Sequence, residues 1–212
     1  MKQNAEKIYL GLLTVTAWFA LIFQFYLHIN SGAASTNELL VRFFSYFTID
    51  SNLLVALCST TIFFFPNSKL GHFFGKSTVK TAINVYILVV ALVYNTVLRF
   101  IWELHGWAIL LNELLHVVVP LMFLIYWIYF VPKHQLKWRN IWAWLIFPLG
   151  YTIFVLGRGG YANFYPYPFL NVDELGLHKV LINCVFVTLV FLVLFIIFVA
   201  IGKRQSKALP KT

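Results

Sequence analysis

Six long apolar runs, separated by gaps in which positive charge alternates between rich and poor, constrain this chain more than any other feature. Each run has about 19 or more residues, and a helix rising ~1.5 Å per residue therefore crosses ~30 Å of hydrocarbon. The sequence predicts an all-α bundle of six transmembrane helices, forming one integral membrane domain over residues 1–212. The expected spans are 8–29, 39–65, 79–102, 108–131, 139–157 and 177–201.

The alternating charge predicts an orientation. Twelve of the sixteen Lys and Arg residues lie on one side, at the N-terminus, in the second and fourth gaps and in the tail. Arg158 and Lys179 alone lie on the other side, and Arg42 and Arg99 fall within spans. Because cytoplasmic loops carry the excess of Lys and Arg, both termini are expected in the cytoplasm. The twelve are Lys2, Lys7, Lys69, Lys76, Lys80, Lys133, Lys137, Arg139, Lys203, Arg204, Lys207 and Lys211.

Composition excludes a water-soluble fold and nucleic-acid binding. Hydrophobic residues make up 61% of the chain and charged residues 11%, whereas a soluble domain has about 25% charged residues. The net charge of +9 is explained by loop cations that set orientation. The first run, 8–28, is too long for the apolar core of a signal peptide and is interpreted as a retained helix. The lipid bilayer is therefore the expected surrounding.

Polar residues within the predicted spans gather at one depth, near the outer face. Thr48 lies about 13 Å into the second span and His116 about 12 Å into the fourth, at ~1.5 Å per residue. Because polar groups inside a bilayer usually face protein or a water-filled cavity, these residues are expected to face one another. The same layer contains Asp50, Asn52, Asn95, Arg99, Asn112, Glu113 and Asn183.

Helical periodicity places the polar residues in stripes. Thr48 and Asn52 share one face, and Asn112, Glu113 and His116 share another. Asp50 points away from Thr48, and an ion pair with Arg42 or with Arg99 is expected, with neither preferred. Pro120 has no N–H to offer the carbonyl of His116, so a kink and a free acceptor are expected beside the imidazole, although a merely tolerated proline fits equally well.

The last outer gap, residues 158–176, is long and rich in aromatic residues and proline. Tyrosines at this position are typical of the interfacial belt of a membrane protein. A stiffened loop above a polar layer also fits a lid, for which Tyr165, Tyr167 and Phe169 are the candidates.

Thr48 and His116 can be interpreted as a nucleophile and its base. A threonine hydroxyl attacks only when a neighbour takes its proton, and an imidazole in an apolar site resists charging and stays available as that base. Asn52, Asn112 or Arg99 could donate to a developing oxyanion. Asp50 or Glu113 could orient the imidazole, as the acid of a catalytic triad does.

Other interpretations stay open at this stage. The polar layer could be the binding site of a small transporter of lipids or organic acids, or of a lipid-binding protein. The polar layer could also only hold helices together in a structural subunit. A metal site from Asp50, Glu113, His116 and His178 lacks any short ligand spacing, and no cofactor motif appears, so no metal and no cofactor are expected.

Three motifs in order resemble one family. They are the run from Phe47 to Asn52, the run Asn112-x-x-x-His116-x-x-x-Pro120, and Tyr167-Pro168-Phe169-Leu170. Over most of its length the chain is similar to the androgen-induced membrane proteins, and it looks most like their bacterial six-span branch. That likeness implies a bacterial cytoplasmic membrane as the location. Animal members are membrane-embedded threonine hydrolases of fatty acid esters of hydroxy fatty acids.

The resemblance implies that Thr48 is the nucleophile and His116 the essential histidine. It favours a lipid ester hydrolase whose fatty acyl substrate enters sideways from the outer leaflet. The remaining polar residues, Arg42 included, are then candidates for binding the substrate or orienting the catalytic pair. The natural lipid, the pathway and the oligomeric state do not follow from the sequence.

Overall fold

The computed structural model describes residues 2–208 and is built from helices, with no strand in that part of the chain. Six helical segments are long and apolar enough to cross a bilayer, so the protein is a multi-pass membrane protein. The long helices are α1 (Lys2–Ile29), α3 (Phe47–Phe64), α5 (Ser77–Thr96), α8 (Asn140–Ala162) and α10 (Leu177–Ala208), with α6 (Trp107–Glu113), η2 (Leu114–Val118) and α7 (Val119–Phe130) forming the sixth crossing.

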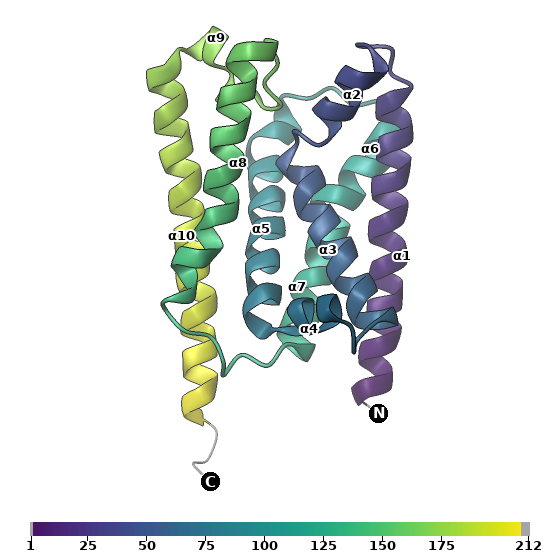
Figure 1. Ribbon diagram of the computed structural model, residues 1–212, viewed down its shortest axis with the longest axis vertical. Helices are drawn as coiled ribbons and strands as arrows, with labels where there is room; N and C mark the ends of the chain where they lie inside the picture. Colours follow the sequence, from purple (N-terminus) through teal and green to yellow (C-terminus); the bar gives the residue numbers. More distant parts are fainter. Residues whose placement is uncertain (1, 209–212) are drawn as a thin grey trace.

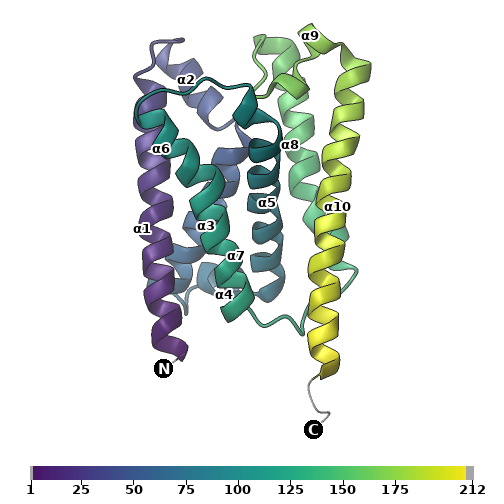
Figure 2. The ribbon, with the colours of Figure 1, turned by 180° about the vertical axis from the view of Figure 1, so that it is seen from behind.

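Two groups of helices stand side by side, with α5 between them. Figures 1 and 2 show α8 and α10 along one flank, and α1, α3, α6 and α7 along the other. One end of the bundle carries the short helices α2 (Thr36–Phe43) and α9 (Val172–Leu175), and is named here the α2 end. The opposite end carries α4 (Lys69–Gly75), the start of α1 and the last described turns of α10.

The second crossing is shorter than the sequence predicts. One helix was expected over 39–65, but α2 ends at Phe43 and α3 begins at Phe47. Tyr46 between them has extended backbone, with φ −89° and ψ 120°. The break keeps the charged side chains of α2 at the end of the bundle, where exposing them to water costs less than carrying them into hydrocarbon. As a result, Thr48 lies in the first turn of α3 and not two turns inside a helix.

The fifth crossing is longer than predicted, since α8 continues to Ala162 instead of ending at 157. Asn163 then stops it in a left-handed conformation, with φ 47°. Gly159 is required within this extension, because the ring of Tyr165 lies where a Cβ on Gly159 would be placed. The loop between α8 and α9 is thereby folded back onto the bundle, over the start of α3.

Candidate active site

The first turn of α3 is held by tyrosine hydroxyls from distant parts of the chain. A helix leaves its first N–H groups without partners inside the helix, and Tyr46 offers no side-chain cap. The Phe47 N–H donates to the hydroxyl of Tyr151 at 3.2 Å, and the Thr48 N–H donates to the hydroxyl of Tyr167 at 3.1 Å. These two bonds fix Thr48 between α8 and the loop that follows it.

The side chain of Thr48 meets that of His116. Oγ1 of Thr48 lies 3.3 Å from Nε2 of His116, and both residues are buried. The other ring nitrogen, Nδ1, lies 2.9 Å from the carbonyl oxygen of Asn112. A carbonyl only accepts, so Nδ1 carries the ring proton and Nε2 of the neutral imidazole has a free lone pair. That lone pair faces the Thr48 hydroxyl, which is the arrangement a general base needs.

Tyr167 completes a chain of donors. Its hydroxyl accepts from the Thr48 N–H and lies 3.2 Å from Oγ1 of Thr48. Burial raises the pKa of Tyr167 to about 12, so the phenol keeps its proton at neutral pH. Donation from Tyr167 to Oγ1, and from Oγ1 to Nε2 of His116, satisfies all three groups at once. The Thr48 hydroxyl is therefore directed at the imidazole.

A π-helical turn, η2, positions His116. Within it the Val119 N–H bonds the carbonyl of Leu114, and Pro120 has no N–H, so the carbonyls of Leu115 and His116 lose their usual helical donors. Two amides from neighbouring helices replace them. Asn52 donates to the Leu115 carbonyl at 3.1 Å, and Asn95 donates to the His116 carbonyl at 3.4 Å. The carbonyl of His116, expected to lack a helical donor, does lack one, and it accepts from Asn95 instead.

Aromatic stacking supports the imidazole from one side. The ring of Tyr94 lies 4.0 Å from that of His116, with an interplanar angle of 20°. The guanidinium of Arg99 lies over the ring of the same tyrosine, 5.1 Å from its centroid, and pairs with Glu113 at 2.6 Å. The stack leaves His116 little freedom to turn away from Thr48.

Two cavities meet at Thr48. A cavity of about 210 Å³ is lined by polar, aromatic and aliphatic residues, and another of about 60 Å³ is lined mainly by apolar ones. Among the residues described, Thr48 is the one shared by both linings. The larger, named here the polar cavity, includes Gln24, His28, Tyr46, Trp102, Asn112 and His116. The smaller, the apolar cavity, includes Val93, Leu98, Leu170, Cys184, Val187 and Phe191.

The predicted asparagines surround the pair of Thr48 and His116, but two of them already donate to backbone carbonyls. Asn52 also donates to the Thr48 carbonyl at 2.8 Å, and Asn95 also donates to the Ala91 carbonyl at 2.8 Å. Asn112 donates to the Ala108 carbonyl and keeps an amide hydrogen beside the polar cavity. Asn112 is therefore better placed than Asn52 to donate to an oxyanion.

The predicted charged residues lie around the pair and do not touch it. The imidazole is oriented by the Asn112 carbonyl and not by Asp50 or Glu113. The expected ion pair of Asp50 with Arg42 or Arg99 is absent from the described part of the chain, because those arginines pair with Glu38 and Glu113. Asp50 instead lies in the first turn of α3, where a carboxylate favours the positive end of the helix.

The predicted loop residues differ in their distance from the pair. Tyr167 is buried against Thr48, and Phe169 stacks on it at 5.3 Å while lining the apolar cavity. Tyr165 packs on Gly159 and not on the pair. Asn183 holds the loop from α10, donating to the Phe169 carbonyl at 2.9 Å. Arg99 lines neither cavity and lies over the ring of Tyr94.

Four residues of the site escaped the sequence analysis: Gln24, His28, Tyr94 and Tyr151. His28 lines the polar cavity and contacts the carbonyl of Leu39 at 3.0 Å. The Gln24 side-chain oxygen is buried and without a hydrogen-bond partner among the described residues. His28 lies near the outer end of the first predicted span, and depth alone could have added it to the polar layer.

No protein-family model, no curated protein and no solved structure matches this chain. Among the described residues, no group of three or more His, Cys, Asp or Glu side chains is placed to hold a metal ion.

Proposed function

We propose that the protein is a membrane-embedded lipid ester hydrolase in which Thr48 is the nucleophile and His116 the base. The observation that carries the proposal is the hydrogen-bonded pair at the junction of the two cavities. Oγ1 of Thr48 lies 3.3 Å from Nε2 of an imidazole whose other nitrogen is held by a backbone carbonyl. The resemblance of the surrounding motifs to a family of threonine hydrolases agrees with this assignment.

The reaction proceeds in two steps. Oγ1 of Thr48 attacks the ester carbonyl carbon while its proton passes to Nε2 of His116. The bond to the alcohol oxygen then breaks, and Nε2 returns the proton to that oxygen, leaving an acyl-threonine. In the second step water attacks the acyl carbon and gives a proton to Nε2. The bond to Thr48 breaks, Oγ1 regains the proton, and a fatty acid departs.

Two donors suit the oxyanion that forms on the carbonyl oxygen. The Tyr167 hydroxyl, 3.2 Å from Oγ1, stays protonated because burial raises its pKa. The amide of Asn112 has a hydrogen to spare on the other side of Thr48. Donors aimed at developing charge in a site that excludes water supply a large part of catalysis, about 10²–10³-fold for one donor.

The two cavities suggest how the ester lies. Hydrocarbon gains by burial in the apolar cavity, between α5 and the pair α8 and α10. The polar cavity suits the more hydrophilic part of the substrate and the attacking water. With both termini in the cytoplasm, as the loop cations predict, the site opens at the level of the outer leaflet.

Purified protein assayed against esters of graded acyl length tests the proposal. Thr48→Ala and His116→Ala are each expected to lower turnover by about 10²-fold or more. Thr96→Ala and His178→Ala are matched controls, because both residues are exposed and lie outside the two cavities. A fluorophosphonate probe should label Thr48 in the wild type and leave His116→Ala unlabelled. Full turnover by both site variants, with no label on Thr48, would show that the mechanism is wrong.

A further inference from the structure

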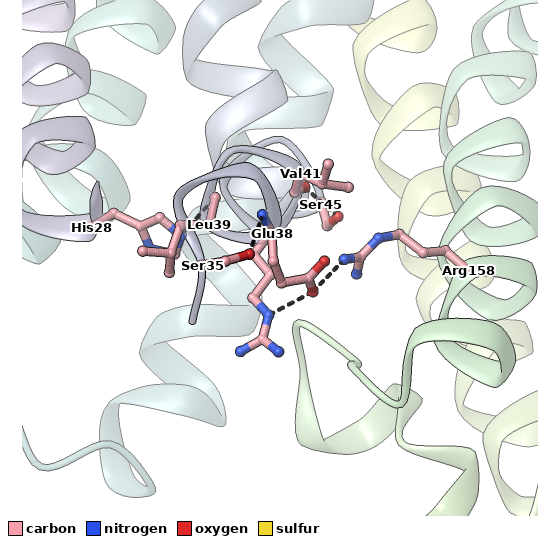
Figure 3. A network of polar contacts seen from close by, with 8 residues as sticks. His28, Ser35, Glu38, Leu39, Val41, Ser45 and Arg158 are labelled. Atoms are coloured by element: carbon pink, nitrogen blue, oxygen red, sulfur yellow. Dashed lines mark hydrogen bonds and ion pairs between the residues drawn. The ribbon is translucent and has the colours of Figure 1, made fainter. Parts of the chain in front are cut away.

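A second cluster of charge at the α2 end plays no part in the chemistry at Thr48. Figure 3 shows Glu38 of α2 facing Arg158, which extends from α8. Oε1 of Glu38 accepts from Nη2 of Arg158 at 2.7 Å and from Nε of Arg42 at 2.8 Å. The Ser35 hydroxyl caps α2 by accepting from the Glu38 N–H, which fixes the position of the carboxylate. One carboxyl oxygen thus joins two guanidinium groups.

The guanidinium groups also share one aromatic ring. The Cζ atom of Arg42 lies 4.4 Å from the centroid of Phe164, and that of Arg158 lies 5.3 Å from it. Cations are attracted to the face of such a ring, which holds both planar groups in fixed positions without neutralising them. The positions of both arginines are therefore set before any ligand arrives.

The cluster has more positive charge than its own acid can balance. Two guanidinium groups meet one carboxylate, and the neighbouring arginines lower the pKa of Glu38, so all three groups are charged at neutral pH. Nη1 of Arg158 is buried and has no hydrogen-bond partner among the described residues. A buried charged donor without an acceptor is costly, about 1–3 kcal/mol or more. An anion bound at this cluster would supply the acceptor that Nη1 of Arg158 lacks.

The cluster lies next to the polar cavity. Phe164 packs edge-on against Tyr46 at 6.2 Å, and Tyr46 lines that cavity and packs against Tyr167 at 5.8 Å. An amphiphile held at the cluster by its charged group would therefore have its apolar part at the bundle, in the position of a membrane lipid. Guanidinium groups match the planar geometry of carboxylates and phosphates, which accept two hydrogen bonds from one arginine.

We propose that Arg42 and Arg158 bind the carboxylate or phosphate group of an anionic amphiphile at the α2 end, where Glu38 bridges the two arginines. The site is independent of the proposed hydrolysis, and it would serve equally in a protein that only binds lipid. It predicts a preference for anionic over zwitterionic amphiphiles.

Binding is measured by calorimetry on the whole protein in a neutral detergent. Dihexanoyl phosphatidate and sodium decanoate are the probes, and dihexanoyl phosphatidylcholine, inorganic phosphate and acetate are the comparisons. The anionic amphiphiles should bind at least tenfold more tightly than phosphatidylcholine and than the free ions. Equal binding of the free ions would overturn an amphiphile site, and equal binding of phosphatidylcholine would overturn an anion site.

Variants separate an anion site from a structural ion pair. Arg42→Gln should weaken binding of the anionic probes by about tenfold, which is the loss of about 1.4 kcal/mol. Lys179→Gln, a matched cation exposed on the same end of the bundle, should leave it unchanged. Thr48→Ala should also leave it unchanged, which keeps this site distinct from the catalytic proposal.

Glu38→Gln gives the sharpest test, because it frees both arginines. An anion site predicts tighter binding of dihexanoyl phosphatidate and a melting temperature that the probe restores to the wild-type value. A purely structural ion pair predicts a lower melting temperature that no anion raises, and that result would overturn the proposal.

Discussion

Two polar clusters are buried at opposite ends of this bundle, and they are built differently. At the α2 end, neutral groups form a directed chain from Tyr167 through Thr48 to His116. At the opposite end, Nζ of Lys80 lies 3.3 Å from the hydroxyl of Tyr126, which donates to Glu6 at 3.1 Å. The first cluster lines both cavities, whereas none of the three residues in the second lines either one.

The difference distinguishes a cluster that can meet a ligand from a cluster that only joins helices. In the Lys80 cluster a buried cation is balanced by a carboxylate through a phenol, and the groups serve to join α5, α7 and α1. In the Thr48 cluster the last acceptor is an imidazole nitrogen, and the hydroxyl before it faces space that a ligand can enter. A hydroxyl directed at a base beside a cavity can act on a ligand, and a closed charge pair can only hold helices.

Removing one phenol oxygen from each cluster gives the largest contrast. Tyr167→Phe should lower esterase turnover by about 10²-fold, because the proposed oxyanion donor and the acceptor for the Thr48 N–H are both lost. Tyr126→Phe should leave turnover unchanged and lower the free energy of unfolding by about 1–3 kcal/mol, since Lys80 loses its partner. Turnover and thermal melting, measured on both variants, check the contrast. Equal effects of the two variants on turnover would remove the distinction between the clusters.

Two buried asparagines, Asn52 and Asn84, should have opposite effects on stability. Asn52→Leu leaves the carbonyls of Thr48 and Leu115 without their donor, so unfolding should become easier by about 1–3 kcal/mol. Asn84 is also fully buried, but neither of its amide atoms has a hydrogen-bond partner in the described part of the chain. Asn84→Leu should therefore stabilise the protein by a comparable amount. Thermal melting of the two variants in one detergent measures both effects. Destabilisation by Asn84→Leu would contradict this expectation.

Much of this arrangement could be predicted from the sequence because it depends on depth. The spans set the approximate level of each residue, so Thr48 and His116 were expected to meet, and they do, although the count of ~1.5 Å per residue assumed a continuous helix where α2 and α3 are separate. The free carbonyl of His116 followed from Pro120. The Glu38 and Arg42 pair was missed, because Arg42 was placed within the second span and was considered as a partner of Asp50, although the i, i+4 spacing of Glu38 and Arg42 is typical of a pair on one helix.

The rest depends on contacts that hydropathy does not encode. Tyr167 and Thr48 are 119 positions apart, and the sequence indicated only an aromatic loop at the right end of the bundle. The orientation of His116 by a backbone carbonyl could not be read from residue types, because every residue has a carbonyl. Lys80 and Lys133 were counted as loop cations, but both are buried, and Lys80 lies within α5, so the charge pattern located the start of that helix only approximately.

The apolar cavity, unlike the polar one, should limit the length of the acyl chain. Val187 of α10 lines the apolar cavity, so under the proposed function Val187→Phe should shorten the acyl chains that the protein accepts. Turnover of the longest esters should fall by about tenfold relative to the shortest, since one methylene is worth about 1–3 kcal/mol in a fitted pocket. Val185→Phe is the matched control, because Val185 is on the same helix and is 60% exposed. A ratio of long to short esters that stays at the wild-type value in Val187→Phe would exclude the apolar cavity as the acyl site.

The smallest effect is expected when the pH is lowered, on the stability that Glu38 contributes through Arg42 and Arg158. Arg42 and then Arg158 lower the pKa of Glu38, so the carboxylate contributes stability that is complete above its ordinary pKa of about 4.3. The contribution is lost as the pH falls through the lowered value, because the protonated acid no longer attracts the two guanidinium groups. A partly exposed pair of this kind is worth about 0–1 kcal/mol. Melting temperatures of the wild type and of Glu38→Gln, compared between about pH 6 and pH 3, should differ at the upper end and converge at the lower. The neutral chain of Tyr167, Thr48 and His116 contains no carboxylate, so a difference that persists in acid would mean that Glu38 stabilises α2 by something other than its charge.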